Sequence, residues 1–150
     1  SIRLADPVRK RFEVMKLTQP LAESMKLKRA LMEDVIDAYT GAAEYGVAEV
    51  TTESTYRLAQ VYEVFGRDVM ESERPPDLDA DALAQNDLLL EAQAFPIDEK
   101  AIALYRANTD RAPDGIWDEW VERSFNRLAG LMPARYAKTE RSEDVVTALY

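Results

Sequence analysis

The chain has 150 residues, of which 47% are hydrophobic and 31% charged. This length and composition are typical of one globular domain and not of a disordered chain. The formal net charge of −9 argues against nucleic acid as a partner, because phosphates demand a basic surface. The absence of Cys and His removes disulfides, thiolate nucleophiles, the common zinc and haem ligands and the usual general base.

No stretch approaches the roughly 18 consecutive apolar residues of a membrane span, so no direct membrane span is expected. No signal peptide opens the chain, and its first three residues suggest the cut edge of a longer protein. Charge is unevenly distributed: residues 1–30 hold eight Lys or Arg against three Asp or Glu, whereas residues 31–150 hold eleven against twenty-five. The basic start, with Arg9 and Arg11, would suit an acidic partner or membrane lipid. A solvated helix face explains it more simply.

Helix-forming residues dominate, and the apolar spacing predicts six helices and no strand. The first helix covers residues 6–18, with Asp6 as N-cap and Pro7 at its first position. After the break at Pro20 a long helix runs to about residue 45, where Gly46 is placed to end it.

The third helix follows the capping residues 51–54 and continues to about residue 73, before the Arg74-Pro75-Pro76 break. Asp79 or Asp81 caps a fourth helix, Pro96 begins a fifth, and a sixth ends near Gly130. The apolar positions expected to pack are Leu21, Met25, Met32, Val35, Ile36, Tyr39 and Ala43; Leu58, Val61, Tyr62, Phe65 and Val69; Leu83, Leu88, Leu89 and Ala92; Ile97, Ala101, Leu104 and Tyr105; Trp117, Trp120, Val121, Phe125 and Leu128.

Short connections predict antiparallel helix pairs that stack into a bundle or solenoid, with one domain at residues 1–133. Residues 134–150 form a C-terminal tail whose order the composition leaves doubtful. The Leu58-Ala59 pair followed by Tyr62 resembles the first helix of a tetratricopeptide repeat, and Ala101, Tyr105 and Pro113 resemble a second helix. No clean repeat of 34 residues aligns. Pairing the third helix with the fourth, or the fourth with the fifth, gives different registers, and both stay open.

A longer resemblance lies in the ordered series Tyr45–Thr52, Thr55–Ala59, Glu71–Pro75, Leu90–Pro96, Glu99–Ile102 and Leu131–Tyr136. Together these segments resemble the C-terminal region of large tetratricopeptide-repeat (TPR) proteins of the Gram-negative cell envelope, which are associated with gliding motility or TonB-like energy coupling. The similarity covers about residues 7–137. It implies an all-α, right-handed stack of antiparallel helix pairs, preceded by further repeats, in a bacterial periplasmic or envelope protein. It implies no catalytic residues.

The segment Asp77 to Asp81 imitates the start of a calcium loop, but Ala82 replaces the required glycine and Leu88 the bidentate glutamate. Helix capping explains these aspartates better, and no metal or cofactor is expected. No phosphate loop, nucleophile elbow or nucleotide fingerprint is present, so no enzyme is predicted.

Several residues are candidates for contact with a protein partner. An acidic cluster at the expected end of the third helix could contact a cation or a basic peptide. The simpler explanation is that the neighbouring Arg74 offsets its charge. Trp117, in the expected sixth helix, could anchor an interface or belong to the core. The candidates are Asp68, Glu71, Glu73, Arg74, Trp117, Arg9 and Arg11.

Three functions are therefore weighed. The first is a non-catalytic scaffold that holds a protein partner in a groove between helix pairs. The second is a structural cap that closes the C-terminal end of a longer solenoid with a polar outer face. The third is a small-ligand-binding domain with an aromatic pocket. A charged or apolar groove would favour binding, and a uniformly polar outer helix would favour a cap.

Overall fold

The computed structural model describes residues 2–43 and 48–133. The described part is helical and contains no strand, which confirms the predicted all-α class. Its elements are α1 (Ile2–Val14), α2 (Leu21–Ala43), α3 (Ala48–Met70), α4 (Ala80–Thr109), a short 3-10 turn η1 (Ala112–Asp114) and a helix over residues 119–133, called the C-terminal helix here.

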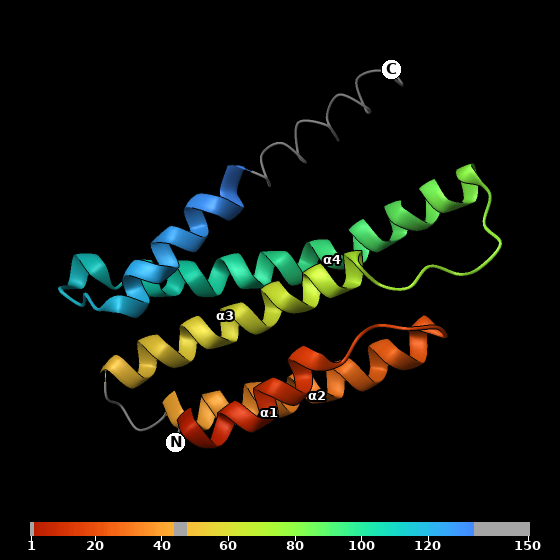
Figure 1. Ribbon diagram of the computed structural model, residues 1–150. Coiled ribbons are helices and arrows are strands. Elements are labelled where there is room, and N and C mark those ends of the chain that lie inside the picture. The colour runs from red at the N-terminus through yellow and green to blue at the C-terminus, as the bar shows by residue number, and fades with distance from the viewer. Residues whose placement is uncertain (1, 44–47, 134–150) are drawn as a thin grey trace.

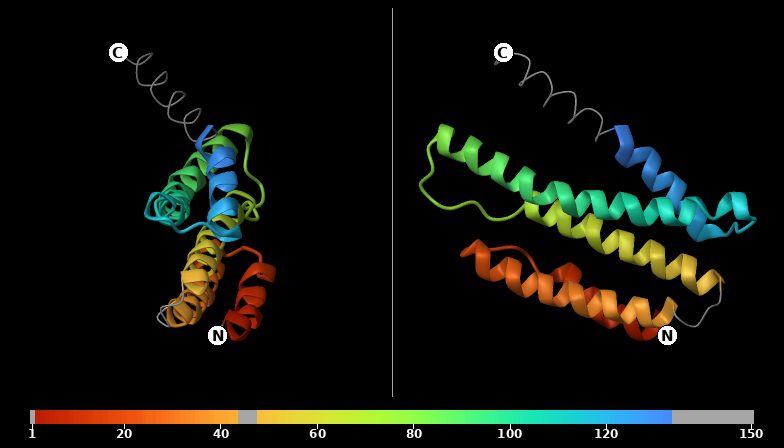
Figure 2. Two further views of the ribbon diagram at one scale, coloured as in Figure 1. Left: turned by 90° about the vertical axis from the view of Figure 1, so that its left-hand side faces the viewer. Right: turned by 180° about the vertical axis from the view of Figure 1, so that it is seen from behind.

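The chain runs back and forth, so that each helix is antiparallel to the one before it (Figure 1). Seen end-on, α3 occupies the middle; α1 and α2 lie on one side of it, and α4 and the C-terminal helix on the other (Figure 2). The most extensive packing joins α3 to α4, followed by α1 with α2 and α2 with α3. Short connections thus place sequence neighbours side by side, as the sequence predicts.

The larger core cluster lies where α1 and α2 meet α3. Phe12, Val35, Tyr39 and Phe65 are essentially inaccessible, and the rings of Phe12 and Phe65 lie 6.1 Å apart. Burial of this set follows the predicted helical spacing on α2 and α3. Phe12 therefore folds back into the domain and does not lie on an exposed N-terminal edge.

A second, smaller cluster joins α3, α4 and the C-terminal helix around three aromatic side chains. The Tyr56 ring lies 5.7 Å from that of Tyr105 and 5.6 Å from that of Trp120. The guanidinium carbons of Arg57 and Arg123 lie 5.0 Å and 4.7 Å from the centre of the Trp120 ring, and this side chain is only 7% exposed. Gly66 faces α4, where a Cβ atom would lie 2.1 Å from Oδ1 of Asp98, so a larger residue would have to displace that carboxylate.

One helix, α4, replaces the predicted fourth and fifth helices, so the described residues form five helices and not six. Pro96 lies inside α4 and cannot donate to the carbonyl of Ala92. Both residues lie on the exposed side of the helix, where water can replace the missing bond. Burial of Leu90, Ala94 and Ile97 against α3 keeps the helix continuous across the proline.

The same burial pattern corrects the predicted core of the segment before Pro96. Leu88 and Leu89 are 65% and 64% exposed, and Leu83 and Ala92 are also exposed. Leu90 and Ala94 take the buried positions instead. The predicted face was therefore wrong by about half a helical turn, because the run of three leucines fits more than one register.

Helix ends also differ from the predicted ones. The first helix runs from Ile2 to Val14 and contains Pro7 at its centre, so Asp6 is not its N-cap. Asp79 is the N-cap of α4, where its side chain accepts a hydrogen bond of 2.8 Å from the Ala82 amide. This confirms the capping explanation for Asp79, whereas Asp81 lies in the first turn of α4 and Asp77 in the loop before it. The predicted stop at Gly46 and the tail over residues 134–150 lie outside the described residues.

Candidate protein-binding surfaces

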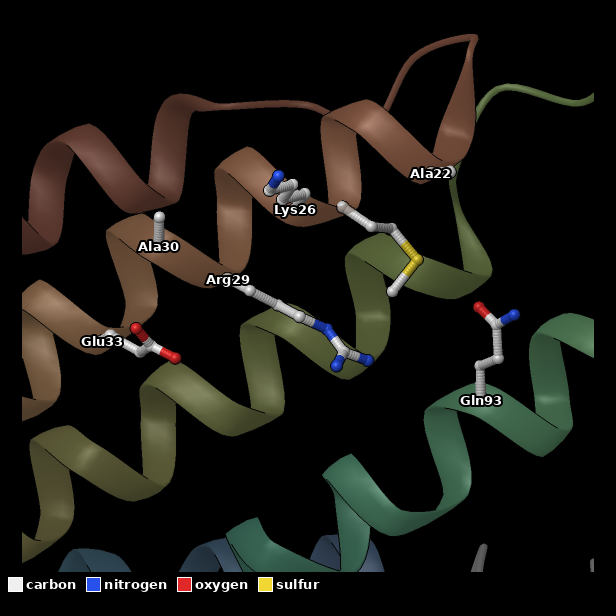
Figure 3. A pocket seen from close by; sticks show the side chains of 7 residues that line it. Ala22, Lys26, Arg29, Ala30, Glu33 and Gln93 are labelled. Carbon is white, nitrogen blue, oxygen red and sulfur yellow. The ribbon is translucent and has the colours of Figure 1, made fainter.

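An open groove of about 670 Å³ lies between α2 and α4. Figure 3 shows side chains from both helices facing across it, with α3 passing between them. Six lining residues come from α2 and only Gln93 from α4: Ala22, Met25, Lys26, Arg29, Ala30 and Glu33 complete the lining. The two alanines leave room for a bound backbone, and Met25 contributes apolar surface.

Two positively charged side chains line the groove. Lys26 and Arg29 are exposed and take part in no ion pair among the residues the structure describes. Glu33 is the acidic residue of the lining, one turn beyond Arg29. A shallow surface with charged walls offers little enclosure to a small apolar molecule. It suits a polar segment of a larger partner better.

Exposed apolar side chains gather on α4. Among the described residues the large hydrophobic side chains with the greatest exposure are Val14, Leu27, Leu83, Leu88, Leu89, Phe95, Trp117 and Phe125. Four of these eight fall within residues 83–95, on the first half of α4. Ala84, Leu88, Ala92 and Phe95 are all exposed at spacings of four, four and three residues, and so share one side of the helix. This set is called the α4 stripe below.

The predicted acidic cluster is only partly a surface feature, because Asp68 turns inward. Its carboxylate contacts Nζ of Lys28, which is completely buried on α2. The same ammonium group donates to the carbonyl of Met15 and lies 4.7 Å from the centre of the Phe12 ring. Asp68 thus neutralises a buried charge. The sequence offered a signal for this: Lys28 follows Met25 by three residues and precedes Met32 by four, in register with the apolar stripe of α2.

The neighbours of Asp68 also make contacts within the chain. Glu73 accepts a hydrogen bond of 3.1 Å from the Gln19 amide. Arg74 donates to the carbonyl of Met70 at 2.7 Å, satisfying the C-terminal end of α3, and to Asp87 at 2.9 Å. Glu71 is exposed and lies 4.0 Å from Arg67. The structure brings these candidates together at one end of α3, mostly as contacts between the α1–α2 turn, α3 and α4.

The other candidates lie elsewhere. Arg9 pairs with Glu13 at 3.1 Å along α1, whereas Arg11 is exposed on the same helix. Trp117 is 60% exposed and lies just before the C-terminal helix, 5.6 Å from the ring of Phe125. That turn is at the opposite end of α3 from Glu73 (Figure 1). The predicted residues therefore do not form one site.

Buried polar groups serve the packing of the helices. Asn108 donates to the carbonyl of Thr52 at 2.9 Å and to Ser124 at 3.1 Å, which joins α4 to α3 and the C-terminal helix. Asp118 caps that helix through the amides of Trp120 and Val121, each at 3.0 Å.

Two tyrosines have perturbed acidity. Burial, opposed by Arg9 and reinforced by Asp6, raises the pKa of Tyr39 to about 12. Burial together with the Glu63 carboxylate also raises the pKa of Tyr105. Both phenols therefore stay protonated near neutral pH and act as hydrogen-bond donors, to Asp6 at 3.3 Å and to Glu63 at 3.5 Å. Neither is poised as a nucleophile or general base.

The described residues contain no group of three or more acidic side chains arranged around a possible metal ion. Within the same ranges no helix is both long and apolar enough to cross a membrane. Comparison of the chain with family models, curated proteins and solved structures gave no match.

Proposed function

We propose that this domain is a non-catalytic scaffold of the helical-repeat type, which binds a protein partner through α4. The exposed apolar side chains on the first half of α4 carry the proposal. Single exposed leucines are normal on protein surfaces, whereas apolar side chains gathered on one helix mark an interaction surface. The groove between α2 and α4 lies along another side of the same helix and is lined by two cations.

The first half of α4 argues against a purely structural cap. A cap needs a polar outer face, because its outer helix meets only water. On α4 the outer side instead carries Leu88, Ala92 and Phe95. The small-ligand alternative would need an enclosed site, and the groove is open with charged walls. Assignment to a TPR solenoid of the bacterial envelope rests on the sequence resemblance and belongs to the same proposal.

Site-specific photo-crosslinking in the cells that naturally make the protein tests this function. A benzophenone amino acid placed at Leu88 should give an adduct with a different protein, because that side chain lies inside the proposed interface. The same group at Leu27, an exposed position on α2 that does not line the groove, serves as the control. Adducts of equal yield at both positions, adducts with the chain itself alone, or none at either position would contradict the proposal.

A further inference from the structure

We propose that the α4 stripe binds a basic amphipathic helix of the partner, an inference that rests on the proposed function. The stripe comprises Ala84, Leu88, Ala92 and Phe95, all exposed on one side of α4. The eleven steps along the helix from Ala84 to Phe95 rise by about 16 Å, so the stripe is about three turns long. A partner helix of three to four turns with apolar residues at every third or fourth position matches that length and spacing.

The charged side chains around the stripe determine which charge a binding partner should carry. Residues 80–95, which include the whole stripe, contain three carboxylates and no lysine or arginine. Asp87 is paired with Arg74, but Asp81 and Glu91 are exposed and take part in no ion pair among the described residues. Asp81 lies about one turn before Ala84, and Glu91 lies beside Leu88 on the flank of the stripe. Lysine or arginine side chains of a bound helix would therefore meet Glu91 along one edge of the stripe and Asp81 beyond its N-terminal end.

The same charges disfavour two other occupants. A second copy of α4 would bring one set of carboxylates against another, which costs free energy instead of stabilising a dimer. An anionic membrane surface attracts lysine and arginine, and the stripe presents neither. A helix with acidic flanks would be repelled in the same way. Charge complementarity thus selects the basic helix among the partners that an apolar stripe could accept.

A pair of fluorescent synthetic peptides tests the inference by fluorescence anisotropy. Both are amphipathic helices with the same leucine stripe; one has lysine and the other glutamate on its flanks. We expect the full protein to bind the lysine peptide and to show at least about ten-fold weaker binding of the glutamate peptide. Leu88→Ser should weaken binding of the lysine peptide by about ten-fold, as loss of an apolar anchor does. Leu27→Ser, at a similarly exposed leucine on α2, should leave it within about two-fold.

General attraction between a cationic peptide and an acidic protein requires its own control. Asp81→Lys with Glu91→Lys should weaken binding of the lysine peptide by about ten-fold. Asp34→Lys with Asp37→Lys makes the same change in net charge at exposed sites on α2 and should have little effect. Equal loss in both variants, equal binding of the two peptides, or binding of neither would overturn the inference. If the Leu88 crosslink still identifies a partner protein, only the partner's chemistry is wrong; if that crosslink also fails, the proposed function fails with it.

Discussion

Replacing Asp68 by alanine removes the carboxylate that neutralises the buried ammonium group of Lys28. Lys28 is fully inaccessible, so its charge would keep only the Met15 carbonyl and the ring of Phe12. Loss of one partner of a buried pair typically costs about 3–5 kcal/mol, mainly because the other charge is left without compensation. The Asp68 side chain is 16% exposed, so water can reach the site and the lower end, about 3 kcal/mol, is expected.

Substituting the other member of the pair, Lys28, should lower the free energy of unfolding by less. Lys28→Met shortens the side chain by one atom and leaves no charge buried on α2, while Asp68 retains partial exposure and lies 3.6 Å from Arg67. We expect a loss of less than about 1.5 kcal/mol. Combining both substitutions should then cost little more than Lys28→Met alone, because the orphaned charge is gone.

Urea unfolding followed by far-UV circular dichroism gives these free energies, since a single helical domain of this size is suited to two-state treatment. Glu71→Ala is the matched control, because Glu71 is an exposed carboxylate three residues along the chain and its removal should change stability by less than about 0.5 kcal/mol. A cost below about 1 kcal/mol for Asp68→Ala, or a larger cost for Lys28→Met than for Asp68→Ala, would refute the reasoning.

Three further predictions concern packing and pH. Phe12→Ala should lower the free energy of unfolding by about 3–5 kcal/mol in the same assay, because the ring is completely buried. Gly41→Ala, with nothing within 4 Å of the new Cβ, should stabilise by up to about 1 kcal/mol, and Gly66→Ala should gain less, because its Cβ would displace the Asp98 carboxylate. The raised pKa of Tyr39 contributes stability below pH 10 that is lost as pH rises towards 12. Urea midpoints measured across that range should therefore fall less steeply for Tyr39→Phe, and an unchanged slope would contradict the assignment.

The sequence predicted the helical class and most of the core, because α2 and α3 carry long apolar stripes with a single consistent register. It failed at α4 for two physical reasons. Proline was treated as a local break, whereas packing of Ala94 and Ile97 on α3 outweighs one lost hydrogen bond. The run Leu88 to Leu90 offered three possible faces, and only the position of α3 decides which leucine is buried.

The candidate surface could be predicted only in part. The sequence predicted a partner contact at the acidic residues near the end of α3. Asp68 instead pairs with Lys28, forty residues away on another helix. Sequence spacing along one helix cannot show such a contact. Exposure of Leu88 was likewise hidden, because leucine at helical spacing usually belongs to a core. The exposed apolar side of α4 could therefore be identified only from the structure, which shows that Leu90 and not Leu88 is buried.

The neighbours of α3 are tied to it by polar contacts set among apolar side chains. Lys28 holds α2 through Asp68, and Asn108 holds α4 through the carbonyl of Thr52. Sliding either helix by one turn would move its side chains by about 5.4 Å and separate these groups without supplying new partners. Sliding of the helices is therefore opposed, because it would leave a buried charge and buried hydrogen-bonding groups without partners. The stripe and the groove keep a fixed separation, and a partner would meet a surface already ordered before it arrives, which lowers the entropic cost of association.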